Sequence, residues 1–418
     1  MGSPIAPPEP GLTPGEMIAR AAAMREELIS RRDEVERLTH HPEDIERRFR
    51  DAGLYRLYVP RRYGGYEFDP LTFVKVVQEL ARGDASTAWC FSLAANHALF
   101  LGSWWDEQAQ DEIFGDGEFR AAAVATPVGM ATRRDGGWSL TGKVAYCSGI
   151  PYSTHYMGQC LTMEGVPEGG EPRQMLFVAA RSEFEIVDDW GNTFGLKGSG
   201  SNSIAFDGGL VPEGWALIDS TMMDIDVTDG TPGLALHGNP MYASKSNGVF
   251  AFSLAAVLVG ACQGALDDLE HILRTRKTFA PPIVERMHDD DDQQWFGAAI
   301  AKVGMYEAVT HRAAELHMEY CRRFAEQGRP FTYEDDQHIA MIAREALLGL
   351  WDVMANDIFR AAGSSAAVDG SRMTHILRDV SMIAGHGNSR LRERYYRELA
   401  RLRFGLPLDN ARLVKQGS

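Results

Sequence analysis

Cysteine is scarce in this sequence, and no apolar run is long enough to span a membrane. The chain has 418 residues and five cysteines, none of which share C-x-x-C spacing, so neither a zinc site nor a disulfide framework is indicated. The cysteines are Cys90, Cys147, Cys160, Cys262 and Cys321. A membrane span needs about 20 apolar residues. The nearest match, "GVFAFSLAAVLVGAC", is shorter and contains Ser253, which predicts a buried core helix. These absences favour a reducing cytoplasm.

Positive charge is also limited. Lysine and arginine number 42 against 58 aspartates and glutamates, and the formal charge is −16. This balance argues against nucleic acid or an anionic membrane as a partner. No G-x-G-x-x-G follows a strand and no Walker motif occurs, so no Rossmann nucleotide site is expected. The Pro-rich opening "MGSPIAPPEP" lacks the regions of a signal peptide, and we expect residues 1–12 to be flexible.

Metal-binding patterns are incomplete. The acidic run at residues 289–292 lacks the spaced ligands and the glycine of a calcium loop, so we expect a solvated loop before the next helix. A di-iron bundle needs two E-x-x-H motifs, and Glu285 to His288 supplies one. No metal is predicted.

The periodicity divides the chain into three parts. Apolar residues recur at three- and four-residue steps in residues 13–118, which predicts a helical domain. Residues 119–235 contain strand-like runs separated by turns, among them a hairpin at Asp135-Gly136-Gly137, and predict six to eight strands in a barrel or sandwich. Residues 236–418 return to long helices typical of a four-helix bundle. The expected class is α+β.

Four short motifs could bind ligands. "STAWCFSLAANHALF" places His97 on an apolar helix, where a lone histidine is more typical of the core. "VAYCSGIPYSTH" places Ser148 and Gly149 at the end of a strand, where a hydroxyl and a backbone N–H could face a ligand. "RTRKTFAPP" puts Arg276 at a helix end, three residues before Phe279. "GLKGSGSNS" alone is more typical of a tight turn than of a phosphate loop.

In this order and spacing, these segments resemble the acyl-CoA dehydrogenase fold. The resemblance is strongest to its monooxygenase branch, the oxygenase components of two-component flavin-dependent aromatic hydroxylases such as 4-hydroxyphenylacetate 3-hydroxylase and the steroid A-ring hydroxylase. It covers almost the whole chain, from "FRDAGLYRLYVPRRYGGYEFD" to "RFGLPLDN", and includes "DWGNTFGLKGSGSN" and "AAGSSAAVDGSRMTHILRDVSMIAGH". The resemblance implies an N-terminal helical domain, a middle β domain and a C-terminal four-helix bundle.

The same resemblance separates two chemistries. Acyl-CoA dehydrogenases use a carboxylate to remove an α-proton, and its two known places in that family align with Ala384 and roughly with Leu254. Both residues are apolar, so a dehydrogenase lacks its base here. The monooxygenase branch instead forms a flavin C4a-hydroperoxide from reduced flavin and O₂. The resemblance implies Ser148 at flavin N5, His386 beside the peroxide, and His97 binding or deprotonating a phenol.

Further residues follow from the resemblance alone. Arg276 and Phe279 resemble the family's phosphate-holding motif, and Arg378 with Asp379 is expected to form a structural ion pair. The remaining expected flavin contacts are Trp89, Thr126, Gly149, Gly363, Ser364 and Ser365.

The resemblance also implies the partners. Reduced FMN or FAD would diffuse from a separate NAD(P)H-flavin reductase to a homotetramer that uses O₂. Phenol hydroxylases of this type usually carry a serine near Val124 and a tryptophan before their Ser-Ser-Gly, whereas this chain has "AYCSG". These changes make the substrate pocket more apolar. A phenol is therefore not the only candidate substrate. The alternatives are a polycyclic aromatic, a thiophene sulfur and the amine of a nucleotide-linked sugar. The alternative enzyme is an acyl-CoA dehydrogenase with an unusual base.

Overall fold

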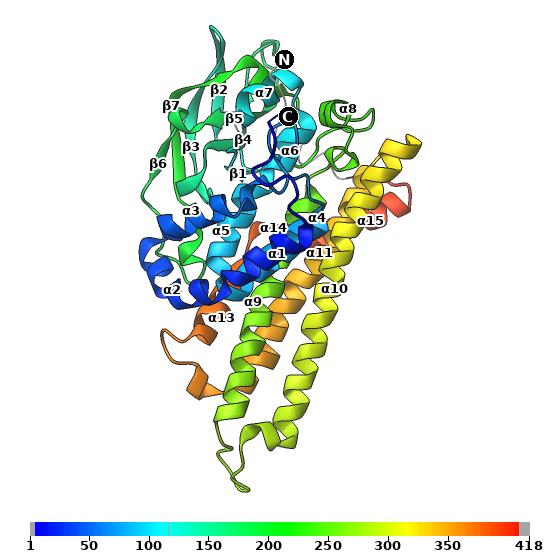
Figure 1. The fold of residues 1–418 in the computed structure, drawn as a ribbon. Helices are drawn as coiled ribbons and strands as arrows, with labels where there is room; N and C mark the ends of the chain where they lie inside the picture. The colour runs from blue at the N-terminus through cyan, green and yellow to red at the C-terminus, as the bar shows by residue number, and fades with distance from the viewer. Residues whose placement is uncertain (1–4, 116, 409–418) are drawn as a thin grey trace.

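The computed structural model describes residues 5–115 and 117–408. Its elements follow the order of helices, one β-sheet and helices again, which confirms the predicted α+β class. Figure 1 shows the sheet at one end of the molecule, with α9, α10 and α11 extending away from it. The first and last helical parts lie side by side, because α4 and α5 both pack against α9.

The N-terminal helices begin where the sequence supplies caps. Thr13 and Glu16 form a capping box at the first helix, and Asp69, Asp84 and Asp106 accept backbone N–H bonds at the starts of three others. The helices are α1 (Pro14–Ala23), α2 (Arg25–Leu38), α3 (Glu43–Asp51), α4 (Pro70–Gly83), α5 (Ala85–Ala95), α6 (His97–Trp104) and α7 (Glu107–Phe114).

The segment before α1 has contacts of its own from Ile5 onward. The Ile5 backbone N–H donates to the Arg62 carbonyl at 3.0 Å, and Leu12 packs against the core. Residues 1–4 of the segment expected to be flexible lie outside the described residues.

Hydrogen bonds join eight strands into one sheet. The strands are β1 (Ala121–Val124), β2 (Gly129–Arg134), β3 (Gly137–Val144), β4 (His155–Thr162), β5 (Arg173–Ala180), β6 (Glu185–Val187), β7 (Ser203–Pro212) and β8 (Ala216–Ile218). Their order is β6-β7-β3-β2-β4-β5-β8. β1 and β2 both pair with β4 in parallel, at successive positions along it, and the other pairs are antiparallel. The predicted hairpin is present, with Arg134 opposite Gly137 across the turn.

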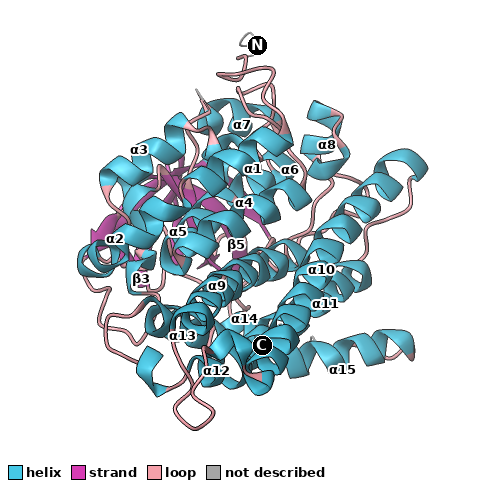
Figure 2. Cartoon of the chain, turned by 60° about the horizontal axis from the view of Figure 1, so that its bottom comes forward, coloured by secondary structure: helices cyan, strands magenta, loops and turns pink. Residues whose placement is uncertain are grey.

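The C-terminal helices are α8 (Pro232–His237), α9 (Asn247–Thr275), α10 (Asp290–Gln327), α11 (Tyr333–Asp352), α12 (Arg360–Ala362), α13 (Arg372–Ala384), α14 (Gly387–Arg390) and α15 (Arg392–Arg403). Among them, α10, α11, α12 and α13 pack against α9. A π-helical segment, Val353–Phe359, continues α11. By length and composition, α9 is the one helix of the described chain that could cross a membrane, but 89% of that stretch is buried inside the protein. Figure 2 shows α9 enclosed by neighbouring helices, as predicted for a core helix.

The acidic run is not a loop, which corrects our expectation. Asp289 caps α10 by accepting from the N–H groups of Asp291 and Asp292, and the next three aspartates form the first helical turn. Negative charge is favourable there because the N-terminus of a helix carries partial positive charge. Asp292 is buried and forms a two-bond pair with Arg286, at 2.6 and 2.8 Å.

Candidate functional site

Trp89, Ser148 and His386 meet although they come from three distant parts of the chain. The Trp89 indole N–H on α5 donates to the Ser148 hydroxyl at 3.0 Å. The His386 ring, just beyond α13, stands edge-on to the Trp89 ring with centroids 5.3 Å apart. The structure thus brings together two predicted catalytic residues and one predicted flavin contact.

Two further hydroxyls extend this cluster. Ser148 Oγ lies 2.7 Å from Ser201 Oγ, which lies 2.6 Å from Ser199 Oγ. The Ser199 hydroxyl is fully buried and forms its hydrogen bond with Ser201. If Ser199 donates to Ser201 and Ser201 donates to Ser148, the Ser148 oxygen accepts two bonds and its own proton stays available to a ligand. Ser148 is the most accessible of the three, at 8%.

The loop that carries Ser148 is held tightly. Gly149 has a φ of 80°, and a Cβ there would lie 2.8 Å from the Cys90 carbonyl oxygen, so a side chain does not fit. The Ser153 hydroxyl donates to the Gly149 carbonyl at 2.9 Å and accepts from the Ala122 N–H at 3.0 Å. Ser153 therefore ties the Ser148 loop to β1.

His97 is held by the same strand. Its Nδ1 lies 2.6 Å from the Ala121 carbonyl oxygen, which can only accept, so Nδ1 carries the proton and Nε2 is left as an acceptor. Nε2 is buried without a hydrogen-bond partner in the described protein. The His97 ring packs against Phe100 and Phe250, with centroids 5.8 and 5.7 Å away, and these two rings contact each other at 5.1 Å. Burial lowers the pKa of His97 to about 4, so the imidazole is neutral at physiological pH.

The two residues expected at the positions of a dehydrogenase base are both apolar. Leu254 is buried in α9, and Ala384 is the last residue of α13. His386 follows two residues later and keeps an accessible face, although protein surrounds it closely enough for desolvation to lower its pKa to about 4. It is therefore neutral and reachable at the same time.

A second group of predicted residues lies elsewhere in the chain. The Arg276 guanidinium, at the C-cap of α9, donates to the Ser365 hydroxyl. Phe279 projects fully into solvent, and Ser364 is also exposed, next to Gly363 with its φ of 79°. Figure 1 shows this end of the α9–α10 hairpin far from the sheet. Within one chain, the structure does not bring Arg276 to the Trp89 cluster.

Thr126 joins neither group. It is exposed in the segment between β1 and β2, beside Ala125, whose carbonyl accepts from the Gln159 side chain.

The expected pair between Arg378 and Asp379 is wrong. Arg378 binds Glu36 at 2.6 Å, whereas the buried Asp379 accepts from the Leu196 N–H at 2.7 Å and from the Ser86 hydroxyl at 3.0 Å. On a helix, adjacent side chains point in different directions, so the two neighbours find separate partners. Asp379 thereby connects α13 to α5 and to the loop that carries Ser199 and Ser201.

The sequence did not predict that Asp379 binds Ser86 and Leu196, or that Ser199 and Ser201 lie beside Ser148. Burial raises the pKa of Asp379 to about 7, with a further contribution from the nearby Asp84. The Gly- and Ser-rich "GLKGSGSNS" was the available signal for the serines. It stays a turn in the fold, as Leu196 and Gly200 both have left-handed backbones.

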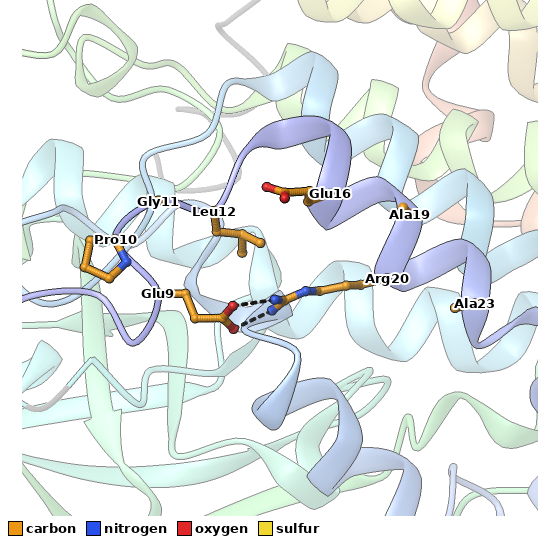
Figure 3. A pocket seen from close by; sticks show the side chains of 8 residues that line it. All are labelled: Glu9, Pro10, Gly11, Leu12, Glu16, Ala19, Arg20 and Ala23. Atoms are coloured by element: carbon orange, nitrogen blue, oxygen red, sulfur yellow. Dashed lines mark hydrogen bonds and ion pairs between the residues drawn. The ribbon is translucent and has the colours of Figure 1, made fainter.

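One surface depression lies apart from all these residues. It is formed by the N-terminal segment and α1, and the Arg20 guanidinium across it is already paired with both oxygens of Glu9, at 2.6 and 2.8 Å (Figure 3). Its lining lacks every residue predicted from the sequence. We therefore place the site at the Trp89 cluster. No group of three possible metal ligands occurs in the part of the chain that the structure describes.

Two family models match the chain. The acyl-CoA dehydrogenase N-terminal domain matches residues 16–109, and its C-terminal domain matches residues 252–390. The flavin-dependent monooxygenase oxygenase subunit HsaA of Rhodococcus jostii (strain RHA1) is 27% identical over 405 residues, covering 94% of this chain and 99% of that protein. HsaA of Mycobacterium tuberculosis (strain ATCC 25618 / H37Rv) is 30% identical over 289 residues, covering 68% of each.

Solved structures share the fold across nearly the whole chain. XiaF from Streptomyces sp., in complex with FADH2 and glycerol, has a TM-score of 0.84 at 20% identity, covering 94% of this chain and 96% of that one. TdsC from Paenibacillus sp. A11-2, with FMN and indole, has a TM-score of 0.75 at 17% identity, covering 94% and 98%. KijD3, with FMN and a dTDP-linked amino sugar, has a TM-score of 0.71 at 22% identity, covering 97% and 96%.

Proposed function

We propose that this chain hydroxylates an aromatic, phenolic substrate. The premise is that the chain belongs to the acyl-CoA dehydrogenase family and is the oxygenase component of a two-component flavin-dependent monooxygenase. The observation that carries the choice of substrate is the buried imidazole of His97, whose Nε2 has no hydrogen-bond partner in the described protein and whose ring packs against two phenylalanines. A phenol fits both features, since its ring packs against the phenylalanines and its hydroxyl donates to Nε2.

Reduced flavin, when bound, reacts with O₂ and supplies the oxygen atom that is transferred. FMN or FAD serves this purpose, as the relatives XiaF, TdsC and KijD3 are described with one or the other. The residues at the Trp89 cluster fit such a ring system. With Trp89 and Ser201 both donating to its oxygen, Ser148 offers its own proton to the ring, and Gly149 holds the Ser148 loop close against α5.

His97 holds the phenol and shares its proton. Because burial lowers the pKa of the imidazole to about 4, His97 acts as a hydrogen-bond acceptor that shifts electron density from the hydroxyl into the ring. That shift makes the ring carbon more nucleophilic toward electrophilic oxygen. Ala384 and Leu254 leave no carboxylate for α-proton abstraction at the two places where a dehydrogenase carries its base.

His386 has a separate role in this proposal. Its neutral ring, next to the Trp89 indole, hydrogen-bonds the activated oxygen and delays its loss as hydrogen peroxide. Exclusion of water by the buried residues of α5 serves the same purpose.

The flavin phosphate is held by a second copy of the chain. Arg276 is exposed at the end of the α9–α10 hairpin with Ser365 as its partner, and exposed apolar residues on α10, Trp295, Ile300 and Met305, provide a surface for association. We therefore propose a cytoplasmic homotetramer in which Arg276, Phe279, Gly363, Ser364 and Ser365 of one copy complete the site of another. A separate NAD(P)H-flavin reductase supplies the reduced flavin by diffusion.

The test is reconstitution with NADH, a flavin reductase, FMN or FAD, and a panel of phenols, thiophenes and amines under isotopically labelled O₂. Mass spectrometry is expected to show one labelled oxygen on a ring carbon. Label on the sulfur of a thiophene or the nitrogen of an amine, with phenols untouched, would refute aromatic hydroxylation. Reduction of bound FAD by an acyl-CoA would refute the monooxygenase itself.

A further inference from the structure

Asn96, next to His97, is buried with both ends of its amide unused. It is 0% exposed, and neither Oδ1 nor Nδ2 has a hydrogen-bond partner in the described protein. Buried amides are nearly always hydrogen-bonded, because desolvating them without a partner is unfavourable. An unpaired Asn96 therefore calls for a partner that comes from outside the chain.

The position of Asn96 on its helix indicates where that partner lies. Asn96 is the C-cap of α5 and keeps helical backbone angles. It follows Trp89 by seven residues, which is two turns to within about 20°, so both side chains lie on the same face, roughly 10 Å apart along the axis. Trp89 contacts Ser148 and His386 on that face. Asn96 thus lies on the same helix face as Trp89, two turns further along the chain, and His97 is the next residue.

The helix α9 carries another unpaired polar group. Phe250 of α9 packs against the His97 ring, and Ser253 follows one turn later on the same helix. The Ser253 hydroxyl is fully buried and has no partner in the part of the chain described. The region around His97 therefore combines apolar rings from α6 and α9 with unpaired polar groups on α9 and at the end of α5.

We infer that Asn96 is a specificity-determining residue that binds a second polar substituent of the aromatic substrate. The inference rests on the proposed function, which assigns the first hydroxyl to His97. The amide both donates and accepts, so the second substituent is a hydroxyl, carbonyl or carboxamide. The substrate class is then an aromatic with two polar groups, and aromatics with one group bind more weakly because they leave Asn96 unpaired.

The experiment compares naphthol with two dihydroxynaphthalenes, one with both hydroxyls on the same ring and one with them on opposite rings. Calorimetric titration of the full-length protein is expected to give a Kd for at least one dihydroxy probe roughly 10- to 100-fold below that of naphthol. In Asn96→Leu this preference falls to about twofold or less, as no amide remains to be paired. Asn96→Ala is expected to give the same loss of preference.

Thermal unfolding separates a ligand-binding role from a structural one. Because Asn96 has no partner in the described protein, Asn96→Leu is expected to leave Tm unchanged or raise it. Gln110 is the matched control, since its buried amide donates to the Gly102 and Trp105 carbonyls and accepts from His237. Gln110→Leu is expected to lower Tm and keep the preference for the dihydroxy probe.

Three results would overturn the inference: no preference in the wild type, an unchanged preference in Asn96→Leu, or a Tm loss in Asn96→Leu like that of Gln110→Leu. Failure of the proposed function gives a different result, because binding requires no turnover. In that case the preference and its loss in Asn96→Leu remain, while reconstituted protein transfers no labelled oxygen.

Discussion

Asp379 makes the stability of the protein depend on pH. Its carboxyl is buried, and burial raises its pKa from 3.8 to about 7. The folded state therefore binds a proton more readily than the unfolded state between these two values, and stability falls as pH rises through that window. One pKa unit corresponds to about 1.36 kcal/mol, so this group contributes a loss of about 2.5 kcal/mol between about pH 5 and pH 8.

Asp379→Asn removes the titration and keeps the contacts. The amide oxygen can still accept from the Leu196 N–H, and the amide nitrogen can donate to the Ser86 hydroxyl. The free energy of unfolding is measured in urea at about pH 5 and pH 8. Its decrease between the two pH values is expected to be about 2.5 kcal/mol smaller in the variant than in the wild type.

The matched control is Ser86→Ala, which loses one bond to Asp379 but keeps the carboxyl. It is expected to be less stable than the wild type at both pH values and to retain the pH dependence. Parallel losses of stability in the wild type and Asp379→Asn would refute the assignment, because the titrating group would then lie elsewhere.

Three further predictions concern turnover and flavin binding. His97→Phe is expected to lower product formation by about 10²- to 10⁴-fold while NADH-dependent release of hydrogen peroxide continues, measured with chromatography and a peroxidase assay; equal loss of both activities would contradict a substrate role. His386→Ala is expected to shift the oxygen balance from product to hydrogen peroxide, and an unchanged ratio would exclude His386 from holding the activated oxygen. Arg276→Ala is expected to weaken FMN affinity roughly tenfold or more by calorimetry, as a charge-assisted bond is lost, whereas Lys277→Ala, one residue on, serves as the control with near-normal affinity.

The architecture was predictable because its signals are local. The capping box of Thr13 and Glu16, the aspartate caps and the Asp135-Gly136 turn all act over two to four residues of sequence, and the turn was predicted from the sequence. The acidic run at residues 289–292 was misassigned although its signal is also local. Asp289 is a typical N-cap, and the following aspartates suit a first helical turn.

The hydrogen bonds that Asp379 accepts were not predictable from one sequence. Its partners Ser86 and Leu196 lie 293 and 183 residues away, and nothing in the local pattern distinguishes them from other polar groups. The same holds for Arg378, whose partner Glu36 is 342 residues away. Long-range pairs of this kind depend on how whole domains pack, whereas the sequence pattern only indicates which helices exist.

In the proposed function, the helix α5 and the residue that follows its C-cap connect the flavin-side group Trp89 to the substrate-side group His97. Ten of its eleven residues are buried, so it has no solvent face, and it contacts both β1 and α9. Trp89 lies on α5, and His97 opens the next helix, α6, eight residues later. Burial also keeps His97 neutral, and desolvation does the same for His386, with pKa values of about 4. Neither imidazole changes charge between about pH 6 and pH 8. We therefore expect the fraction of oxygen transferred to substrate to be constant over this range, whereas a decline centred near pH 6.5 would show that one of the two histidines titrates at its ordinary pKa.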